Sequence, residues 1–433
     1  MRMLGQLPDM FSSVSLDCPT GFYVQSTETI IDGNLMRKPT LTIFYQFNPW
    51  ESSIGGIQTI IRYFIKYAPQ DFDVRLVGTE VDPKRKVGEW YSSHLEGREL
   101  MFFPLFLLQN DDVRQIVPTS LRYTLSLLSK DFSSDFLHFH RLEPALSAFR
   151  WSGQKMLFVH NDIHQQIRAK DVAQGILWKR FPQAYFAFER LLIGQFDQIL
   201  SCNSESTQLY KEQYPKFADR VSFVRNTFDG DIFYPLSSDM RHDYRQKLAY
   251  QLGLSQDTRF LLFAGRLHPQ KDPLLLIKAM AHLQEENVHL LIAGDGELAS
   301  AMREEIESLG LSERISMLGS LSQSELADLH RVSSAFVLSS AYEGLPLVVL
   351  EALACGTPVV TTRAGETPRL LNSNSGVISE ARTPDVLANA IQVVLSQPEH
   401  YTAGACVANA EPYSAETVIH KIYGEMLTDW VPK

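Results

Sequence analysis

The sequence predicts an α/β protein with two domains, each built on a doubly wound parallel sheet. Short apolar runs rich in β-branched and aromatic residues alternate with stretches whose apolar residues recur at helical spacing. This alternation is typical of βαβ units, and it occurs in both halves of the chain. The length of 433 residues also suits two domains, at roughly 100 to 200 residues each. We therefore expect two sheets whose strand ends face one another across a cleft.

The strands expected in the second half are more strongly apolar than those in the first. The run 260–264 is apolar on both faces, as in a parallel sheet covered on both sides. In the first half we expect strands at 41–47, 73–77, 136–139, 156–159, 198–201 and 222–224, and a helix at 57–65. In the second half we expect strands at 260–264, 288–293, 315–318, 334–338 and 358–362, and helices at 273–283, 297–309, 324–331 and 347–355.

These expected elements divide the chain into an extension and two domains. Residues 1–38 show no clear period and form an N-terminal extension. Residues 39–228 form the first domain and residues 229–414 the second, with a lapse in apolar patterning between them. The last helix is amphipathic, and we expect the segment 415–433 to cross back onto the first domain.

The charge balance narrows the class of ligand. Fifty acidic side chains against forty Lys and Arg give a formal charge of −10. A protein that wraps nucleic acid usually has the opposite sign, so a nucleic-acid polymer is not expected as a partner. An anionic ligand must instead be held by a local cluster of donors.

Compartment and membrane contact follow from the cysteines and the apolar runs. The cysteines form no CxxC pair or Cys/His cluster, which predicts reduced, buried thiols and no metal site: Cys18, Cys202, Cys355 and Cys406. No long apolar stretch of a secretory signal opens the sequence, and the longest apolar run, Met101–Leu108, is far shorter than the roughly 20 residues of a membrane span. We expect a cytoplasmic protein, at most peripheral at the inner face of a membrane. The stretch from Trp178 to Phe188 is either an amphipathic core helix or a basic, aromatic helix that lies on such a surface.

A first candidate site follows the buried strand 260–264. Gly265 allows close backbone approach, Arg266 can bind two phosphate oxygens, and Lys271 adds a point charge. Pro273 suits the first position of the next helix. These residues are a plausible diphosphate clamp, and the alternative is a solvated loop with two ordinary cations.

A second candidate site surrounds Glu343 and Glu351, which are separated by seven residues. Pro346 suits a first helical position, and Gly356 suits the position after the helix end. Glu351 then lies on an otherwise apolar helix, where a carboxylate needs hydrogen bonds such as those of a ligand hydroxyl pair. The alternative is a structural carboxylate. Backbone N–H groups at this helix start can face an anion: Gly344, Leu345, Leu347 and Val348.

Five further features are weaker when taken singly. Gly294 lies in a Gly-Asp-Gly turn that by itself favours no ligand, and Met317-Leu318 ends a strand that could meet a base edge. Gly55-Gly56 precedes a helix that could meet a phosphate. His160 ends a strand at the cleft, as His138 and His140 do one strand earlier, although single histidines are more often structural. The acidic pairs Asp71/Asp73 and Asp229/Asp231 are interpreted as turn acids and not as metal ligands.

Taken in order, these motifs resemble the retaining, nucleotide-sugar-dependent glycosyltransferases of group 1, which have the GT-B fold and a Glu-x7-Glu motif. The dense part of the resemblance covers about residues 220–400 and includes Gly265-Arg266, Lys271-Asp272-Pro273, Glu343-Gly344-Leu345-Pro346 and Glu351-Ala352-Leu353-Ala354-Cys355-Gly356-Thr357-Pro358. It implies two Rossmann-like domains and transfer of a sugar, with retained configuration and without an essential metal or other cofactor. The acceptor would be a glycan, a lipid-linked molecule or a small molecule, in glycan biosynthesis or a related pathway.

The resemblance also implies roles for single residues. Arg266 and Lys271 would hold and stabilise the diphosphate, Glu343 the donor sugar, and Glu351 the ribose hydroxyls. His160 would contact the donor sugar and orient the acceptor. The base would meet the backbone near Met317-Leu318. The remaining donor-binding positions are Gly55, Gly56, Gly265, Gly294, Gly344, Leu345, Leu347 and Val348.

Three departures from the family pattern limit what carries over. Asn226-Thr227-Phe228-Asp229 replaces the usual Asn-Gly-x-Asp, and Ala364–Arg369 replaces a double glycine followed by proline and glutamate. The extension 1–38 has no counterpart. Two other functions stay open: an epimerase or hydrolase of the same fold that acts on the nucleotide sugar, and a catalytically silent nucleotide-sugar-binding protein. The sugar, base, acceptor and oligomeric state do not follow from the sequence.

Overall fold

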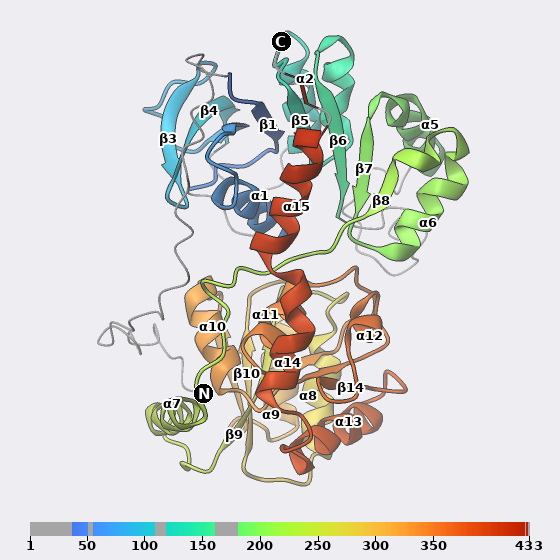
Figure 1. The fold of residues 1–433 in the computed structure, drawn as a ribbon. Coiled ribbons are helices and arrows are strands. Elements are labelled where there is room, and N and C mark those ends of the chain that lie inside the picture. Colours follow the sequence, from blue (N-terminus) through green and yellow to red (C-terminus); the bar gives the residue numbers. More distant parts are fainter. Residues whose placement is uncertain (1–36, 51–54, 109–117, 161–180, 429, 432–433) are drawn as a thin grey trace.

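The structure, a computed structural model, describes residues 37–50, 55–108, 118–160, 181–428 and 430–431. Two α/β units are stacked one above the other in it, each with its own sheet (Figure 1). The fold class expected from the sequence is therefore confirmed. Most of the N-terminal extension and residues 178–180 of the basic, aromatic stretch lie outside the described residues.

The first sheet has eight strands in the described part of the chain, in the spatial order β3-β4-β2-β1-β5-β6-β7-β8. Every neighbouring pair is parallel except β3 and β4. The strands are β1 (Thr40–Phe44), β2 (Asp73–Glu80), β3 (Tyr91–Leu95), β4 (Arg98–Leu107), β5 (Phe136–Phe139), β6 (Gln154–Val159), β7 (Gln198–Ser201) and β8 (Val221–Phe223). The strands expected at 136–139 and 198–201 have the same bounds in the structure.

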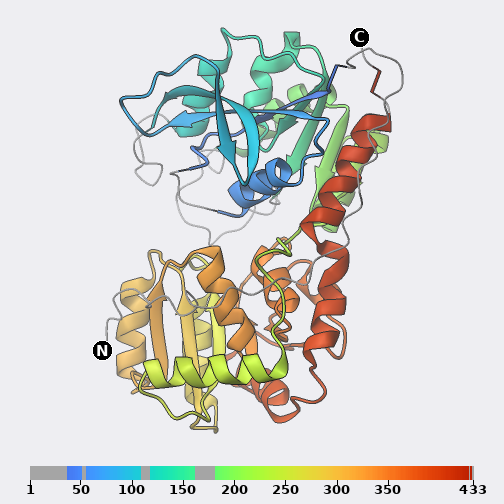
Figure 2. The same ribbon diagram turned by 60° about the vertical axis from the view of Figure 1, so that its left-hand side comes forward.

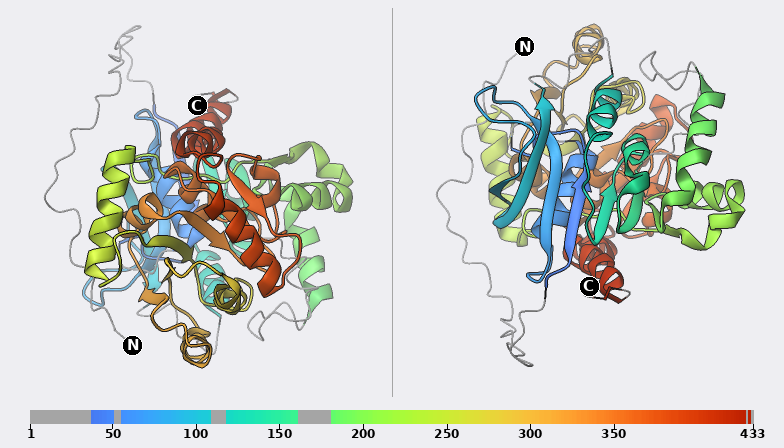
Figure 3. Two further views of the ribbon diagram at one scale, coloured as in Figure 1. Left: turned by 90° about the horizontal axis from the view of Figure 1, so that it is seen from below. Right: turned by 90° about the horizontal axis from the view of Figure 1, so that it is seen from above.

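Helices cover the first sheet. The described helices of this unit are α1 (Gly56–Lys66), α2 (Thr119–Leu127), η1 (Glu143–Arg150), α5 (Pro182–Leu192), η2 (Ile193–Gln195), α6 (Ser204–Gln213) and η3 (Pro215–Arg220). Helices α5 and α6 lie beside the β7–β8 end of the sheet, as Figures 1 and 3 both show.

The β3–β4 hairpin is the main element that the sequence pattern did not predict. The apolar run Met101–Leu108 belongs largely to β4, which pairs with β2 on one side and β3 on the other. Its turn contains Glu96 and Gly97, both with positive φ (52° and 73°). Because the run is apolar with little alternation, its periodicity does not distinguish a buried strand from a helix.

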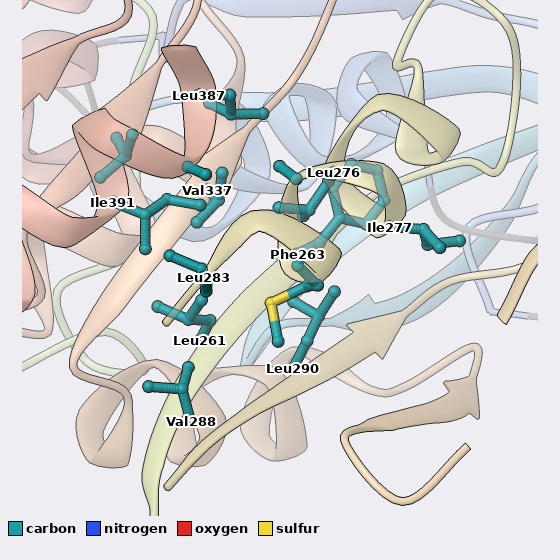
Figure 4. Packing of buried hydrophobic residues seen from close by; sticks show 14 of the residues in the cluster. Leu261, Phe263, Leu276, Ile277, Leu283, Val288, Leu290, Val337, Leu387 and Ile391 are labelled. Carbon is teal, nitrogen blue, oxygen red and sulfur yellow. The ribbon is translucent and has the colours of Figure 1, made fainter. Parts of the chain in front are cut away.

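The second sheet has six parallel strands, in the order β11-β10-β9-β12-β13-β14. The strands are β9 (Arg259–Ala264), β10 (Val288–Ala293), β11 (Ile315–Gly319), β12 (Ala335–Leu338), β13 (Val359–Thr361) and β14 (Gly376–Ile378). The described helices here are α7 (Ser238–Gln251), α8 (Pro273–His282), α9 (Ala299–Ser308), α10 (Gln323–Val332), α11 (Leu347–Ala354), α12 (Thr367–Leu370), α13 (Pro384–Ser396), α14 (Ala403–Ala410) and η4 (Glu411–Tyr413). Figure 4 shows one of its two cores, in which Leu261 and Phe263 of β9 contact leucines and isoleucines of α8 and α13.

The last helix, α15 (Ala415–Thr428), returns to the first unit. Figure 2 shows α14 and α15 running one after the other from the lower unit to the upper one. The buried face of α15, which includes Ile419 and Tyr423, packs in the same core as Leu41 of β1 and Phe64 of α1. Its amphipathic pattern is thus explained by burial against the first sheet.

In its described part, the chain crosses between the units twice, and the two crossings are bonded to each other. Phe228 N–H donates to Tyr413 O (3.2 Å), and Ala415 N–H donates to Phe228 O (2.8 Å). Arg225 lies over the ring of Tyr413, with its guanidinium carbon 5.3 Å from the ring centroid. The two segments therefore form one short connection.

Asp229, on the first crossing, is a turn acid, as the sequence predicts, and it has a second role. It accepts a hydrogen bond from the N–H of Asp231 (3.0 Å), as a turn acid does. However, its side chain is buried and also binds Lys66 Nζ (2.6 Å) and Tyr67 Oη (2.7 Å) at the end of α1. Asp229 thus fixes the crossing to the first unit, a role for which local sequence gives no signal.

The anchoring of α15 is testable at Tyr423. Its buried hydroxyl donates to Phe64 O (2.8 Å), one of the last carbonyls of α1 that lack a helical partner. We expect Tyr423→Phe to lower the free energy of unfolding by about 1–2 kcal/mol in urea denaturation. Tyr250→Phe is the control, because Tyr250 is 80% exposed. Equal effects of the two substitutions would contradict this role of Tyr423.

Candidate active site

The two loops predicted to hold the donor are bound to each other in the second unit. Lys271 Nζ lies 2.6 Å from Glu343 Oε1, and Ser340 Oγ donates to the same oxygen at 2.6 Å. The Glu343 side chain is only 6% exposed, whereas that of Lys271 is 20% exposed. The structure thus brings together the cation of the first motif and the first carboxylate of the second.

Backbone bonds fix this arrangement. Ala341 N–H donates to Gln270 O (2.8 Å), and Ser339 Oγ donates to Lys271 O (2.9 Å). Asp272 caps the start of α8 by accepting from Leu275 N–H (3.3 Å), which ends the Lys271 loop at Pro273 as expected. Arg266 is exposed in the same loop and makes no ion pair with any described residue. Its guanidinium is therefore available to a ligand.

The backbone at the start of α11 differs slightly from the expectation. Helix α11 begins at Leu347, and Pro346 is its N-cap, with φ −70° and ψ 133°. Proline is therefore one position earlier than predicted, because its extended ψ leaves it outside the helix. Gly356 follows the helix end with φ +75°, as predicted.

Two helix starts, one from each unit, meet at this point. A Cβ built on Gly56, the first residue of α1, would lie 3.9 Å from Leu347 Cδ1. Neither Gly55 nor Pro346 caps its helix with a side-chain hydrogen bond. Among the described residues, both starts therefore present backbone N–H groups without a capping side chain, a combination that suits an anion.

Glu351 is buried on α11, and its Oε2 has no hydrogen-bond partner among the described residues. Burial raises the pKa of Glu351 to about 8. Tyr63 of α1 is a neighbour of Glu351. Burial raises the pKa of Tyr63, and the Glu351 carboxylate raises it further. An unpartnered buried carboxyl is costly unless a ligand supplies donors.

The strand ends beneath the clamp are tightly packed. Gly294 has φ +138°, its N–H donates to Gly319 O (2.7 Å), and a Cβ there would lie 1.9 Å from Gly265 O. Met317 and Leu318 are on β11, the edge strand of the sheet, and their side chains pack into opposite cores. An edge strand leaves backbone groups on its outer side without sheet partners.

His160 reaches the same place from the first unit. A Cβ built on Gly344 would lie 3.6 Å from His160 O, so the strand end of β6 adjoins the turn that carries Glu343. His140 Nδ1 lies 2.9 Å from His160 Nε2, with the two rings stacked. Burial lowers the pKa of His160 to about 4, so its imidazole is neutral near pH 7. His138 lies deeper, where its Nε2 contacts Met156 Sδ (3.1 Å), which is a structural position.

Several contacts of this region had no signal in the sequence. Asn226 Nδ2 donates to Leu345 O (2.6 Å), so Asn226, at the start of the first departure, holds the loop before α11. Glu366, in the second departure, accepts from Ser204 N–H (2.8 Å) and Oγ–H (2.6 Å) across the two units. Because each pair joins residues more than one hundred positions apart, only the tertiary structure could reveal it.

Two absences hold for the described part of the chain. No group of three His, Cys, Asp or Glu side chains there could hold a metal ion. No helix there is long and apolar enough to cross a membrane. Its three cysteines, Cys202, Cys355 and Cys406, are buried and free.

Two Rossmann-like units that meet at their strand ends define the GT-B fold. Solved structures superpose on both units and show the same fold. Sucrose-phosphate synthase from Thermosynechococcus elongatus superposes with a TM-score of 0.72 at 18% identity, covering 91% of this chain and 100% of that one. HepE from Anabaena, solved in complex with UDP-glucose, gives 0.66 at 17% identity, covering 90% and 100%. Residues 245–410, which lie in the second unit, match the family model described as Glycosyl transferases group 1.

Curated relatives match over a similar region. The D-inositol 3-phosphate glycosyltransferase of Streptomyces bingchenggensis is 28% identical over 265 residues, 58% of this chain and 56% of that protein. Its counterpart from Xylanimonas cellulosilytica is 30% identical over 257 residues, 58% and 60% of the two chains. The chain thus spans less than two thirds of the length of these relatives.

The packing beneath the clamp is testable at Gly294. We expect Gly294→Ala to lower the free energy of unfolding by about 2 kcal/mol or more, because φ is positive and a Cβ would overlap Gly265 O. Gly404→Ala in α14, where a Cβ meets nothing within 4 Å, is the matched control. It should be neutral or slightly stabilising in the same urea titration. An equally stable Gly294→Ala protein would contradict the packing described.

Proposed function

We propose that this protein is a retaining glycosyltransferase that moves a sugar from a nucleoside-diphosphate sugar to an acceptor hydroxyl, without a metal ion or other cofactor. The observation that carries the proposal is the pairing of Lys271 with Glu343 beside two uncapped helix starts. The group 1 match of the second unit supports the reaction class. The UDP-glucose named for HepE and the reaction named for the curated relatives support a nucleotide-sugar donor.

Different residues would bind different parts of the donor. Arg266, Lys271 and the backbone N–H groups at Gly56 and Leu347 would hold the diphosphate, whose negative charge is repelled by the net −10 of the chain and therefore needs local donors. Glu351 would accept from the ribose hydroxyls, which would satisfy its buried oxygen. The base would lie against the outer backbone of β11 near Met317 and Leu318.

The reaction would break the bond between the anomeric carbon and the diphosphate oxygen. The acceptor oxygen forms the new bond on the same face, and its proton passes to the departing phosphate oxygen. Arg266 and Lys271 stabilise the negative charge that develops on the leaving group, so no metal charge is required. Glu343 positions the sugar, and neutral His160 accepts or donates a hydrogen bond at the acceptor side.

Placement in the cell remains part of the proposal. We propose a cytoplasmic enzyme whose acceptor is a glycan, a lipid-linked molecule or a small molecule. Contact with the inner face of a membrane is supported by two exposed apolar side chains, Phe181 (60%) before α5 and Leu191 (62%) on it. Co-sedimentation with anionic liposomes tests this contact.

The site assignment is tested by Lys271→Ala and Glu343→Ala. Each should lower kcat for sugar transfer at least about a hundredfold, because each removes a charge from the reacting centre. Circular dichroism should show an unchanged fold. Lys421→Ala is the control, since Lys421 is 77% exposed on α15 and pairs only with Glu425 at 3.9 Å.

Product analysis decides between the reaction classes. Donors are first screened by thermal shift with UDP-, GDP- and ADP-sugars, since a specific donor raises apparent stability by mass action. Full turnover in the absence of an acceptor would favour an epimerase or hydrolase. Donor binding with no turnover under any condition would favour a silent binding protein. Wild-type kcat in either Lys271→Ala or Glu343→Ala would overturn the site.

The role of Glu351 predicts proton release on nucleotide binding. Its pKa of about 8 leaves the free carboxyl largely protonated near pH 7, and donors from ribose would favour the charged form and lower that pKa. Calorimetry of UDP, GDP and ADP binding in two buffers of different ionisation enthalpy should therefore show proton release. This proton release should disappear in Glu351→Gln. The nucleotide's own phosphate titrates equally in both proteins. Identical buffer dependence in the two would contradict the ribose role.

A further inference from the structure

Glu366 joins the two units through its side chain. It lies just before α12 in the second unit and is 8% exposed. Its Oε1 accepts from the N–H (2.8 Å) and the Oγ–H (2.6 Å) of Ser204, the first residue of α6 in the first unit. A carboxylate at a helix N-terminus is favoured both by the free N–H groups and by the helix dipole.

Arg369 makes a second contact between the units, next to the first. Arg369 pairs with Glu366 Oε1 (3.2 Å), donates to Ser204 Oγ and lies 3.6 Å from Glu205 of α6. Because Arg369 and Glu205 are more than half exposed, their ion pair contributes little. Within this cluster, the contact between α6 and the loop before α12 therefore depends mainly on the bonds of Glu366 with Ser204.

The backbone of the same residue holds the turn that carries Glu343. Glu366 N–H donates to Gly344 O (3.0 Å). Gly365 has φ +59°, and a Cβ there would lie 2.1 Å from Glu343 O and 2.2 Å from Gly344 O. The backbones of the two loops are therefore in direct contact, with no side chain between them.

We propose that Glu366 is a positioning residue that couples the approach of the first unit to the placement of Glu343. When α6 is within reach, its N-terminus fixes the Glu366 carboxylate, and the Glu366 backbone fixes Gly344 and hence the turn of Glu343. When α6 moves away, the carboxylate loses both donors and the turn loses a restraint. This inference rests on the proposed transferase function, because it assigns Glu343 to the donor sugar.

The enzymatic test compares Glu366→Ala with Glu366→Gln. The Ala variant should lower kcat about tenfold while the Kd of the nucleoside diphosphate stays unchanged, because the clamp residues keep their contacts. The Gln variant keeps an oxygen for Ser204 and should recover most of kcat. Glu380→Ala is the control, since Glu380 is 75% exposed and pairs with Arg363 at 2.7 Å away from this link.

A double-mutant cycle tests the partner. Ser204→Ala removes the hydroxyl donor but keeps the backbone N–H, so its loss of kcat should be smaller, about threefold. Combined with Glu366→Ala it should add little, because only the contact of Arg369 with Ser204 Oγ is then left to lose. Additive losses, an unchanged kcat in Glu366→Ala, or a Gln variant as impaired as the Ala variant would each overturn the proposal.

A distance measurement separates this proposal from the transferase function itself. Spin labels are placed at Leu125→Cys in α2 and Tyr250→Cys in α7, both exposed, in a Cys18→Ser background. Glu366→Ala should broaden the distribution of distances between the units, whereas Glu380→Ala should not. An unchanged distribution in Glu366→Ala would overturn the coupling. A wild-type protein that transfers no sugar would overturn the proposed function, while the distance result would still decide the link.

Discussion

The structure depends on a chain that crosses twice between its two sheets and bonds the crossings to each other. The hydrogen bonds of Phe228 with Tyr413 and Ala415 place the two connecting segments side by side. Burial of α15 against the first sheet stabilises the return crossing, because Tyr423 and its apolar neighbours belong to the core of the first unit. As a result, the start of α1 and the end of β6 adjoin the loop and the helix start of α11 in the other unit.

The proposed clamp would concentrate positive charge against the net charge of the chain. A total of −10 disfavours anions in general, yet Arg266, Lys271 and two helix starts would together serve one anion. Backbone N–H groups carry partial positive charge without adding a side chain that could pair with an acid elsewhere. Lys271 is already paired with Glu343, so an arriving diphosphate would share this cation. The proposed clamp would suit the diphosphate of a single nucleotide and would not suit a polymer of phosphates.

The second departure from the family pattern shows how a change in one loop can affect both units. Where the family pattern has a double glycine followed by a proline and a glutamate, this chain has Ala364-Gly365-Glu366, and Glu366 reaches α6 of the other unit. Gly365 has a close backbone contact with the Glu343 turn. The loop thus contacts both the Glu343 turn and the first unit.

The sequence by itself determined the fold class and most of the strands, and it indicates the residues of the proposed clamp. It could do so because buried parallel strands are continuous apolar runs, and because the clamp and the Glu-x7-Glu pair are local in sequence. It did not predict the β3–β4 hairpin, since an apolar run such as Met101–Leu108 has no period that selects a strand. Only the tertiary structure decided which distant residues meet: Asp229 with Lys66, Asn226 with Leu345, and Glu366 with Ser204. Each of these contacts depends on how two separately folded sheets are placed, and no local pattern of residues records that placement.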